Sequence, residues 1–458
     1  MARRFMDFCG QYSSHFVGQG RNSISHSRHY LSGLLGTQRR KNIETIENDV
    51  SGSDYQGMEQ FISTSPWDHR ALLDDVAVDA DKVLGDKDNT GFYIDESSFL
   101  KKGRASVGVQ RQWSGRAGKV ENCQVAVFGC LGKGEEFALT DFRLFLPKEW
   151  AEDPARCDKA KIPQDQREYK AKWELALEMV TQARKNGARF GWVGVDSLYG
   201  HNNQFLNALE DSGERFMADV RKDFKVWTSL PALEVPARSA SKKGRVPKRL
   251  RLNEKSNQAE CIRVDEYARK HFSKRQREIA YRQGSKGKLC ARVWVVDVWV
   301  WEARWPGAAR KRRLVVRQDE AGDFKYSLTN LPPTLSWKRL AYVQNQRFWI
   351  EHAFHEAKSQ LGMAQYQVRV WRGWHHHMAL VALATVFMMR AKRHHQQSHP
   401  LLSYRDITEL LDYYLPRRNR DENEVHERIK VRHEARQRDL DRRKRQKTGL
   451  AREPDLTK

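Results

Sequence analysis

Apolar residues along the chain change their spacing near Gly91, and this change separates a helical region from a sheet. Residues 1–85 place apolar side chains at helical intervals, for example in SRHYLSGLLG, and predict a small helical unit. Beyond Gly91 the apolar runs become short and β-rich. Three consecutive strands are predicted over residues 90–98 (TGFYIDESS), 122–131 (NCQVAVFGCL) and 135–147 (EEFALTDFRLFLP).

The next segment alternates between helix and strand. Residues 165–187 carry an apolar stripe at helical spacing and end at Gly187, as is typical of a helix C-terminus. A strand over 188–200 (ARFGWVGVDSLYG) stops at Asp196, and a short helix and a fifth strand over 215–227 follow. The order βββαβαβ predicts an α/β fold with a mixed sheet.

A second group of strands interrupts this sheet. Residues 229–258 are rich in Pro, Ser and basic residues, whereas 289–305 and 312–330 return to β-rich patterns. We therefore expect a β-rich insertion, followed by a long amphipathic helix over 336–363 and a helix that begins after Ser403. The predicted units are a helical N-terminal domain (1–85), the first part of the α/β core (86–227), the β-rich insertion (228–334), the final helices of the core (335–395), and a C-terminal helix with a basic tail (396–458).

The charge balance indicates an anionic partner. Lys and Arg number 82 against 58 Asp and Glu, a formal net charge of +24, and nucleic acid commonly offsets such an excess. The longest apolar run, 378–389, is shorter than the roughly 20 residues of a membrane span, so we expect no membrane partner. The N-terminus lacks a secretory signal, which predicts a cytoplasmic protein, associated with the nucleoid when bound to DNA. Six cysteines without a CxxC pair argue against a zinc finger and a disulfide framework.

Three acidic residues occupy positions where their side chains can meet. Asp95 and Asp196 each end a hydrophobic strand, and side chains converge at such ends in α/β sheets. The predicted long helix supplies Glu351, which shares one helical stripe with Arg347 and Lys358. The sequence therefore predicts a carboxylate cluster beside two cations.

Neighbouring residues offer alternatives. Glu96 could replace Asp95 because successive residues on a strand face opposite sides, and Glu356 could replace Glu351. The run His375–His377 favours a polar start to the apolar helix over a metal site. Three tryptophans of the insertion favour sheet core over stacking on an unpaired base: Trp294, Trp299 and Trp301.

Three carboxylates that meet repel one another unless cations lie between them. Mg²⁺ and Mn²⁺ prefer oxygen ligands, and two such ions about 3.5 to 4 Å apart activate a water or hydroxyl against a phosphodiester. The sequence therefore predicts phosphoryl transfer at DNA with two divalent ions. The basic residues that follow Asp95 would neutralise backbone phosphates: Lys101, Lys102, Arg104, Arg111, Arg116 and Lys119.

Three segments together resemble the DDE transposases of bacterial insertion sequences. They are residues 94–129 (IDESSFLKKGRASVGVQRQWSGRAGKVENCQVAVFG), 192–200 (WVGVDSLYG) and 347–374 (RFWIEHAFHEAKSQLGMAQYQVRVWRGW), and the likeness runs from about residue 60 to 395. The resemblance is to the RNase H-like branch with a β-rich insertion before the last catalytic helix. It implies that Asp95, Asp196 and Glu351 are the catalytic, metal-binding acids.

The same branch carries a Y-x2-R-x3-E-x6-K signature. Arg347, Glu351 and Lys358 match it, and the resemblance implies that Arg347 and Lys358 contact DNA. Gln344 occupies the tyrosine position, and Tyr342 lies two residues away.

The resemblance also implies a function. It predicts a transposase that cleaves double-stranded DNA at the terminal inverted repeats of an insertion sequence and joins the ends to target DNA. It further implies two Mg²⁺ or Mn²⁺ ions, a homodimer in the synaptic complex, and DNA binding by the N-terminal helices. The alternatives are a structure-selective DNA nuclease that does not join, and a catalytically inactive relative that only binds DNA.

Overall fold

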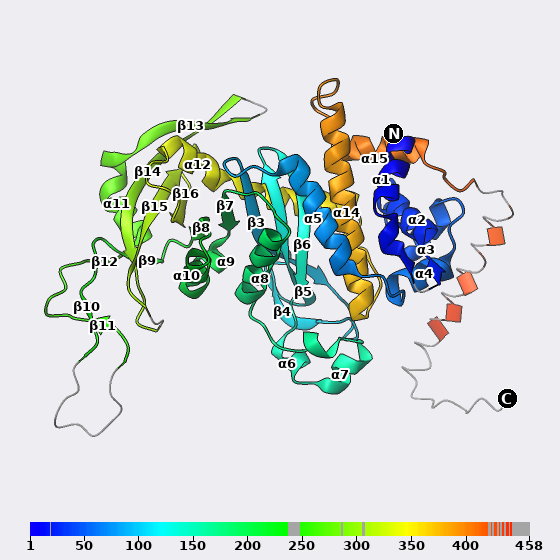
Figure 1. The fold of residues 1–458 in the computed structure, drawn as a ribbon, viewed down its shortest axis with the longest axis horizontal. Helices are drawn as coiled ribbons and strands as arrows, with labels where there is room; N and C mark the ends of the chain where they lie inside the picture. The colour runs from blue at the N-terminus through cyan, green and yellow to red at the C-terminus, as the bar shows by residue number, and fades with distance from the viewer. Residues whose placement is uncertain are drawn as a thin grey trace.

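A mixed β-sheet spans the left and central parts of the molecule in the computed structural model, and the N-terminal helices lie beyond it on the right (Figure 1). The structure describes residues 1–18, 20–236, 248–284, 287–304 and 307–419, with scattered positions between 423 and 441. Within these residues the sheet has twelve strands, and ten of them follow the order β12-β9-β14-β15-β16-β8-β7-β3-β5-β4. The other two strands are β13, which pairs with β14, and β6, which pairs with β5. Most of the predicted basic tail lies outside the described residues.

The central strands form a mixed sheet, as the sequence predicted. The strands β3 (Thr90–Leu100), β5 (Lys119–Lys133) and β6 (Glu136–Leu144) are antiparallel neighbours. The strands β7 (Trp192–Val195) and β8 (Phe216–Val220) run parallel to β3. One further strand, β4 (Gln110–Ser114), was not predicted, because it is a short edge strand with exposed polar residues.

Helices connect and cover these strands. The chain passes from β6 to β7 through α6 (Lys148–Ala151), α7 (Pro154–Lys159) and α8 (Lys172–Lys185). Two short helices then precede β8: α9 (Ser197–Gly200) and α10 (Asn203–Asp211). The apolar stripe of α8 includes Leu175, Met179 and Ala183, all buried against the sheet. This arrangement places Val195, the last residue of β7, opposite Ile94 in the middle of β3.

Most strands of the β-rich insertion continue the central sheet, whereas β10 and β11 form a separate two-stranded sheet. The last strand of the insertion, β16 (Phe324–Thr329), pairs antiparallel with β8, so that Leu328 lies opposite Ala218. The other elements are β9 (Lys225–Trp227), β10 (Leu233–Glu234), β11 (Arg251–Leu252), β12 (Cys261–Arg263), α11 (Val264–Arg275), β13 (Arg277–Gly284), β14 (Gly287–Val300) and β15 (Arg310–Gln318). Trp294 is buried as expected, and Trp299 and Trp301 are half-buried.

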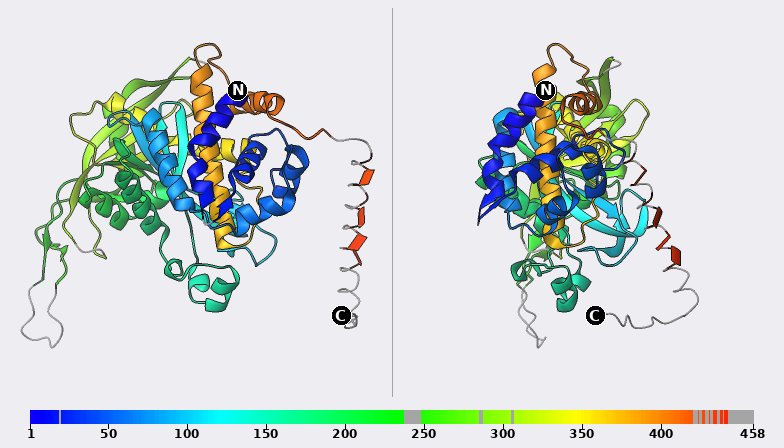
Figure 2. Two further views of the ribbon diagram at one scale, coloured as in Figure 1. Left: turned by 45° about the vertical axis from the view of Figure 1, so that its right-hand side comes forward. Right: turned by 90° about the vertical axis from the view of Figure 1, so that its right-hand side faces the viewer.

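Helices at the N-terminus pack around a long buried helix (Figures 1 and 2). They are α1 (Ala2–Gln11), α2 (Ile24–Leu34), α3 (Ile43–Asp49), α4 (Tyr55–Ser63) and α5 (His69–Leu84). The long helix, α14 (Trp371–His395), separates α1 to α4 from the sheet. None of the helices among the described residues is long and apolar enough to cross a membrane.

The run His375–His377 joins α14 to its neighbours. The three side chains are buried, and each has a different partner. His375 bonds the Trp371 carbonyl, His376 bonds the carbonyls of Ile62 and Trp67, and His377 bonds the Tyr30 hydroxyl at 2.9 Å. The start of α14 is therefore polar, as expected, but it is buried and hydrogen-bonded.

The predicted long helix over 336–363 is in fact two helices, α12 (Trp337–Gln346) and α13 (Phe348–Gln360), which meet at Arg347. The helix α12 packs against β8 and the insertion strands, whereas α13 packs against β3, β5 and β6. Because the sheet twists, one straight helix cannot follow both regions. The last helix, α15 (Tyr404–Tyr414), begins with the predicted capping box between Ser403 and Asp406.

Candidate active site

Three aspartates form a row across neighbouring parallel strands. In the pairing of β3 with β7, Ile94 lies opposite Val195, and in the pairing of β7 with β8, Val195 lies opposite Ala218. The next residue on each strand is an aspartate: Asp95, Asp196 and Asp219. The sheet therefore brings together two acids that the sequence predicted and a third that it did not.

The side chain of Asp95 lies on the face of the sheet that α13 covers. Asp95 is opposite Phe128 in the antiparallel pairing with β5, and paired residues share a face. The ring of Phe128 contacts the ring of Phe354 on α13, with centroids 5.4 Å apart. Glu96 points to the other face, where its carboxylate pairs with Lys172 of α8 at 2.5 Å. The strand β3 continues to Leu100, so Asp95 lies within the strand and not at its end as expected. Of the two alternatives, Asp95 is the one that faces Glu351.

Arg347 connects the row to α13. Its guanidinium lies 3.2 Å from the Asp95 carboxylate, 3.0 Å from Asp219 and 2.7 Å from Glu351. The side chain is only 14% exposed. Burial opposes the charge of Arg347, but the surrounding carboxylates, Asp219 first, outweigh it and raise the pKa of the guanidinium. One cation therefore links acids from β3, β8 and α13.

The carboxylates carry more charge than Arg347 balances. Burial, with repulsion from Asp196, raises the pKa of Asp95 to about 7. Burial also raises the pKa of Asp196, although Arg347 and the backbone N–H groups of Tyr199 and Leu198 oppose the shift. Oxygen ligands with unbalanced negative charge are the donor set that hard divalent cations prefer, so these residues fit a Mg²⁺ or Mn²⁺ site.

Asp219 has partners that fix its position. Its carboxylate accepts a hydrogen bond from the Ser327 hydroxyl at 2.6 Å and lies 3.0 Å from the ammonium of Lys325. Both partners belong to β16, the last strand of the insertion. The signal in the sequence was a single acid within an otherwise apolar strand, FMADV, but only the strand register shows that it lies level with Asp95 and Asp196.

A groove opens beside Glu351. It is a cavity of about 560 Å³ lined by Glu96, Ser97, Ser98, Gly115, Arg116, Glu351, Phe354, His355, Lys358 and Ser359. Burial, with repulsion from Arg116, lowers the pKa of Lys358 to about 8. The structure thus places Lys358 and Arg116 in the same groove as the acid of α13.

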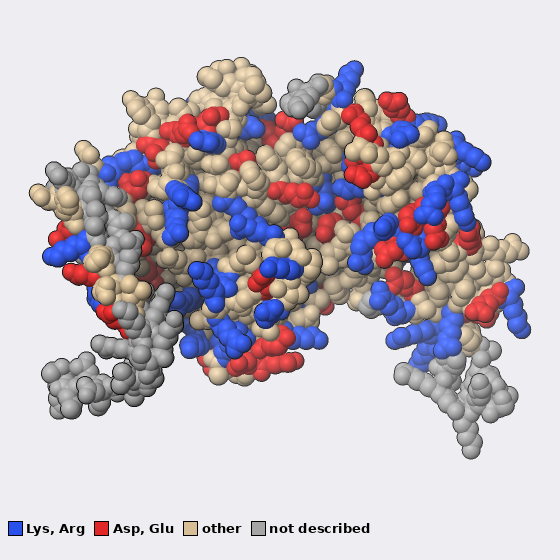
Figure 3. Space-filling view, turned by 180° about the vertical axis from the view of Figure 1, so that it is seen from behind, with Lys and Arg blue, Asp and Glu red and all other residues tan. Residues whose placement is uncertain are grey.

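The other predicted DNA contacts lie outside the carboxylate cluster. Lys102, Arg104 and Arg111 are exposed, whereas Lys101 is half-buried, with its ammonium 3.6 Å from the centre of the Tyr366 ring. Figure 3 shows one face of the molecule, where Lys and Arg are spread among groups of Asp and Glu instead of forming one continuous patch.

The two residues near the tyrosine position of the signature differ in their surroundings. Gln344 is buried, and its amide donates to the Ser327 hydroxyl at 2.8 Å. Tyr342 is half-buried, and the guanidinium of Arg339 lies 4.9 Å from its ring centre. Gln344 therefore supports the contact between α12 and β16. Glu356, the alternative to Glu351, lies instead beside His352 and His355.

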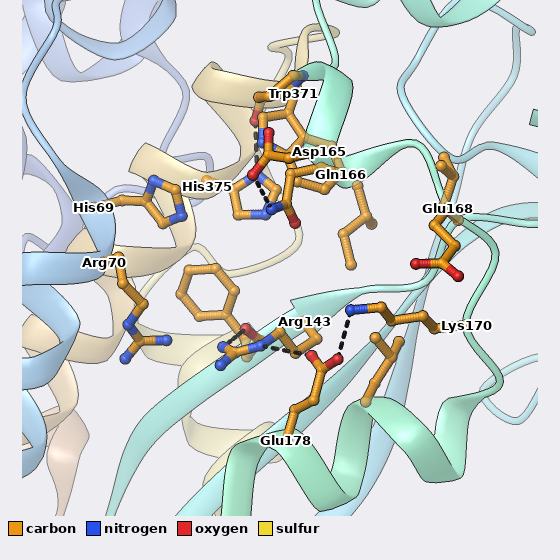
Figure 4. Close-up of a pocket in the computed structure, with 15 residues that line it drawn as sticks. His69, Arg70, Arg143, Asp165, Gln166, Glu168, Lys170, Glu178, Trp371 and His375 are labelled. Carbon is orange, nitrogen blue, oxygen red and sulfur yellow. Dashed lines mark hydrogen bonds and ion pairs between the residues drawn. The ribbon is translucent and has the colours of Figure 1, made fainter. Parts of the chain in front are cut away.

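A second cavity, of about 470 Å³, lies between β6, α8 and the start of α14 (Figure 4). Three of its charged groups pair with one another: the carboxylate of Glu178 lies 2.6 Å from the ammonium of Lys170 and 4.0 Å from Arg143. His375 bonds the Trp371 carbonyl at 2.8 Å in the same wall. No carboxylate of the aspartate row lines this cavity, so it is separate from the candidate active site.

Comparison with known proteins identifies the family. Residues 19–288 match a family model described as DDE superfamily endonuclease. The match covers more than half of the chain and includes the strands that carry Asp95, Asp196 and Asp219. The chain belongs to the DDE endonuclease superfamily. Endonucleases of this superfamily act on DNA and generally use divalent metal ions.

A curated relative is similar to part of this DDE endonuclease. The protein named "Probable transposase for insertion sequence element IS701", from Microchaete diplosiphon, is 28% identical over 227 residues, which are 49% of this chain and 55% of that protein. The chain therefore spans just over half the length of the curated relative that it matches. The predicted family and α/β fold class are confirmed.

Proposed function

We propose that this DDE endonuclease is a transposase that cleaves DNA at the ends of an insertion sequence and joins those ends to target DNA. The observation that carries the proposal is the level row of aspartates on β3, β7 and β8, joined through Arg347 to Glu351 of α13. The likeness to a protein named as a transposase supports it. The substrates would be double-stranded terminal inverted repeats and the target duplex.

Asp95, Asp196 and Glu351 would hold two Mg²⁺ or Mn²⁺ ions. When bound, the ions would activate the attacking water or 3′ hydroxyl and stabilise the leaving oxygen of the phosphodiester. Asp219 has Arg347, Lys325 and Ser327 as partners, so its role would be to hold Arg347 in place. Arg347 in turn positions the carboxylates of Asp95 and Glu351.

Basic side chains would bind the sugar-phosphate backbone. Lys358, in the groove beside Glu351, would contact phosphate closest to the reacting bond. The other proposed contacts are Lys101, Lys102, Arg104 and Arg111. Two ends must be cut and joined together, so we propose that two copies of the chain act in the synaptic complex.

The test is cleavage and strand transfer on a duplex that carries the inverted repeat next to the coding sequence. With Mg²⁺ the parent protein should yield both products, and EDTA should abolish them. Asp95→Asn, Asp196→Asn and Glu351→Gln should each reduce cleavage by about 1,000-fold or more. Glu178→Gln, which alters a carboxylate of the second cavity away from the aspartate row, is the matched control and should retain cleavage.

Three results would count against parts of the proposal. Cleavage without joined products would indicate a nuclease that does not transfer strands. DNA binding without cleavage under any divalent ion would indicate a binding protein only. Cleavage by the three acid variants at the rate of the parent would refute the assignment of the triad.

A further inference from the structure

A second group of metal-ligating side chains lies on α13, next to Glu351. One ligand atom each from His352, His355 and Glu356 lie within 4.8 Å of one another. Residues at i, i+3 and i+4 of a helix occupy adjacent turns on one face, so this spacing brings the three side chains together without any other element. Glu351 faces Arg347 and takes no part in this group.

The three side chains make only long polar contacts with one another. The nearest oxygen of Glu356 is 3.8 Å from Nε2 of His352 and 3.7 Å from Nδ1 of His355. Both distances are longer than a hydrogen bond. A metal ion between them would replace two weak contacts by three direct bonds of about 2.0 to 2.2 Å.

Packing restricts the side chains that would bind. The ring of His352 contacts Phe137, with centroids 5.4 Å apart, and Trp349, with centroids 5.5 Å apart. Glu356 is only 17% exposed, whereas His355 is 72% exposed. The group is therefore partly preorganised, and one side remains open to water as a further ligand.

We propose that His352, His355 and Glu356 form a binding site for Zn²⁺, separate from the carboxylate site. Two imidazoles and one carboxylate favour a borderline ion such as Zn²⁺ over Mg²⁺, which prefers oxygen ligands. Two charged neighbours of the site are Lys392, which disfavours a positive charge on His352, and Glu135, which favours it. Zn²⁺ binding does not depend on the proposed transposase activity.

The Zn²⁺ site also affects the groove beside Glu351, and this consequence rests on the proposed function. His355 lines the groove together with Glu351 and Lys358. A Zn²⁺ ion on His355 would add positive charge at the edge of the surface proposed to bind DNA phosphate.

Calorimetric titration of the full chain, stripped of metal with EDTA and then dialysed, tests the site without DNA. In excess Mg²⁺, which occupies the carboxylate site, we expect one Zn²⁺ per chain, bound with micromolar or tighter affinity. His355→Gln should weaken binding by about tenfold or more. Since His355 is exposed, this variant should fold, and circular dichroism checks that it does. His352→Gln and Glu356→Gln should weaken binding as well.

Two controls separate this site from others. Glu351→Gln should bind Zn²⁺ as the parent does, and so should His394→Gln, which alters one of two adjacent histidines near the end of α14. Equal affinity of His355→Gln and the parent would overturn the proposal. Loss of Zn²⁺ binding in Glu351→Gln, or its displacement by Mg²⁺, would also overturn it, because the ion would then occupy the carboxylate site.

Discussion

Nε of Arg347 lies 3.0 Å from the Asp219 carboxylate, and this pair joins the two halves of the interrupted core. Arg347 comes from the junction of α12 and α13, after the insertion, whereas Asp219 comes from β8, before it. The same guanidinium reaches Asp95 and Glu351. The position of the acid on α13 therefore depends on a contact with a residue outside the predicted triad.

Asp219→Asn should reduce cleavage by about 10- to 100-fold, because it removes a charge that holds Arg347. Asp95, Asp196 and Glu351 should still bind the metal ions. The variant should therefore have a lower cleavage rate at saturating Mg²⁺, while the Mg²⁺ concentration needed for half of that rate should change little. Lys325→Met is the matched comparison, since it removes the other cation beside Asp219 and leaves Arg347 in place. Cleavage by Asp219→Asn at the parent rate would show that Arg347 needs no support from β8.

Asp95→Asn should abolish cleavage yet stabilise the metal-free protein. Burial raises the pKa of Asp95 from its ordinary value of 3.8 to about 7, so ionised Asp95 destabilises the fold above pH 7. At pH 8 the variant should gain about 1 to 3 kcal/mol in the free energy of unfolding. The gain should shrink as the pH falls from 7 towards 3.8 and disappear below 3.8, where Asp95 is protonated in both the folded and the unfolded state. Urea unfolding at several pH values, in EDTA, measures it.

The same pKa predicts how cleavage depends on pH. Metal binding requires the ionised carboxylate, so at limiting Mg²⁺ the rate should rise with pH up to about 7 and then level off. Below that pH the slope should be about one logarithmic unit per pH unit. Glu178→Gln should follow the parent profile, because Glu178 lies in the second cavity, away from the aspartate row. A rate that stays constant from one unit below to one unit above this pKa would contradict the assignment of Asp95 as a ligand.

Gly200→Ala should damage the site without changing a charge. A Cβ atom at Gly200 would overlap the carbonyl oxygen of Asp219, so α9 would have to move away from β8. We expect a loss of about 1 to 3 kcal/mol in stability and a large loss of cleavage, since Asp196 is the N-cap of α9. Gly10→Ala is the control: Gly10 lies in α1, and a Cβ atom added there would have no neighbour within 4 Å, so the change should be neutral or slightly stabilising. Thermal unfolding and the cleavage assay report the two effects.

Much of the site follows from local patterns, because strand ends and helical stripes are visible in the sequence. Local patterns singled out Asp95, Asp196 and Glu351, and the structure places Asp95 level with Asp196 and links it to Glu351 through Arg347. Asp95 lies within β3 and not at its end, and the catalytic role of the three acids stays a prediction. Asp219 was missed because its importance depends on the register of β8 against β7, which no local pattern contains. The break at Arg347 was missed for a related reason. The apolar stripe continues across it, but α12 packs against β8 and the insertion strands, whereas α13 packs against β3, β5 and β6.

The continuity of the insertion with the core also depends on long-range pairing. The β-rich segments were predicted, but their pairing with β8 through β16 was not, because hydrophobic patterns specify strands and leave their partners open. The helix α11 was also missed, although Val264, Ala268 and Phe272 recur at intervals of four, since charged residues surround them.

The backbone hydrogen bonds between β8 and β16 restrict how the insertion can move relative to the core when the protein binds a DNA duplex. A hinge between insertion and core would have to break backbone hydrogen bonds beside Asp219, and with them the bond from Ser327 to its carboxylate. If the insertion bends, the twist of the shared sheet must change, and this change extends to β3, β7 and β8, the strands that carry the aspartates. DNA that bends the insertion would thereby adjust the spacing of the carboxylates proposed to hold the metal ions.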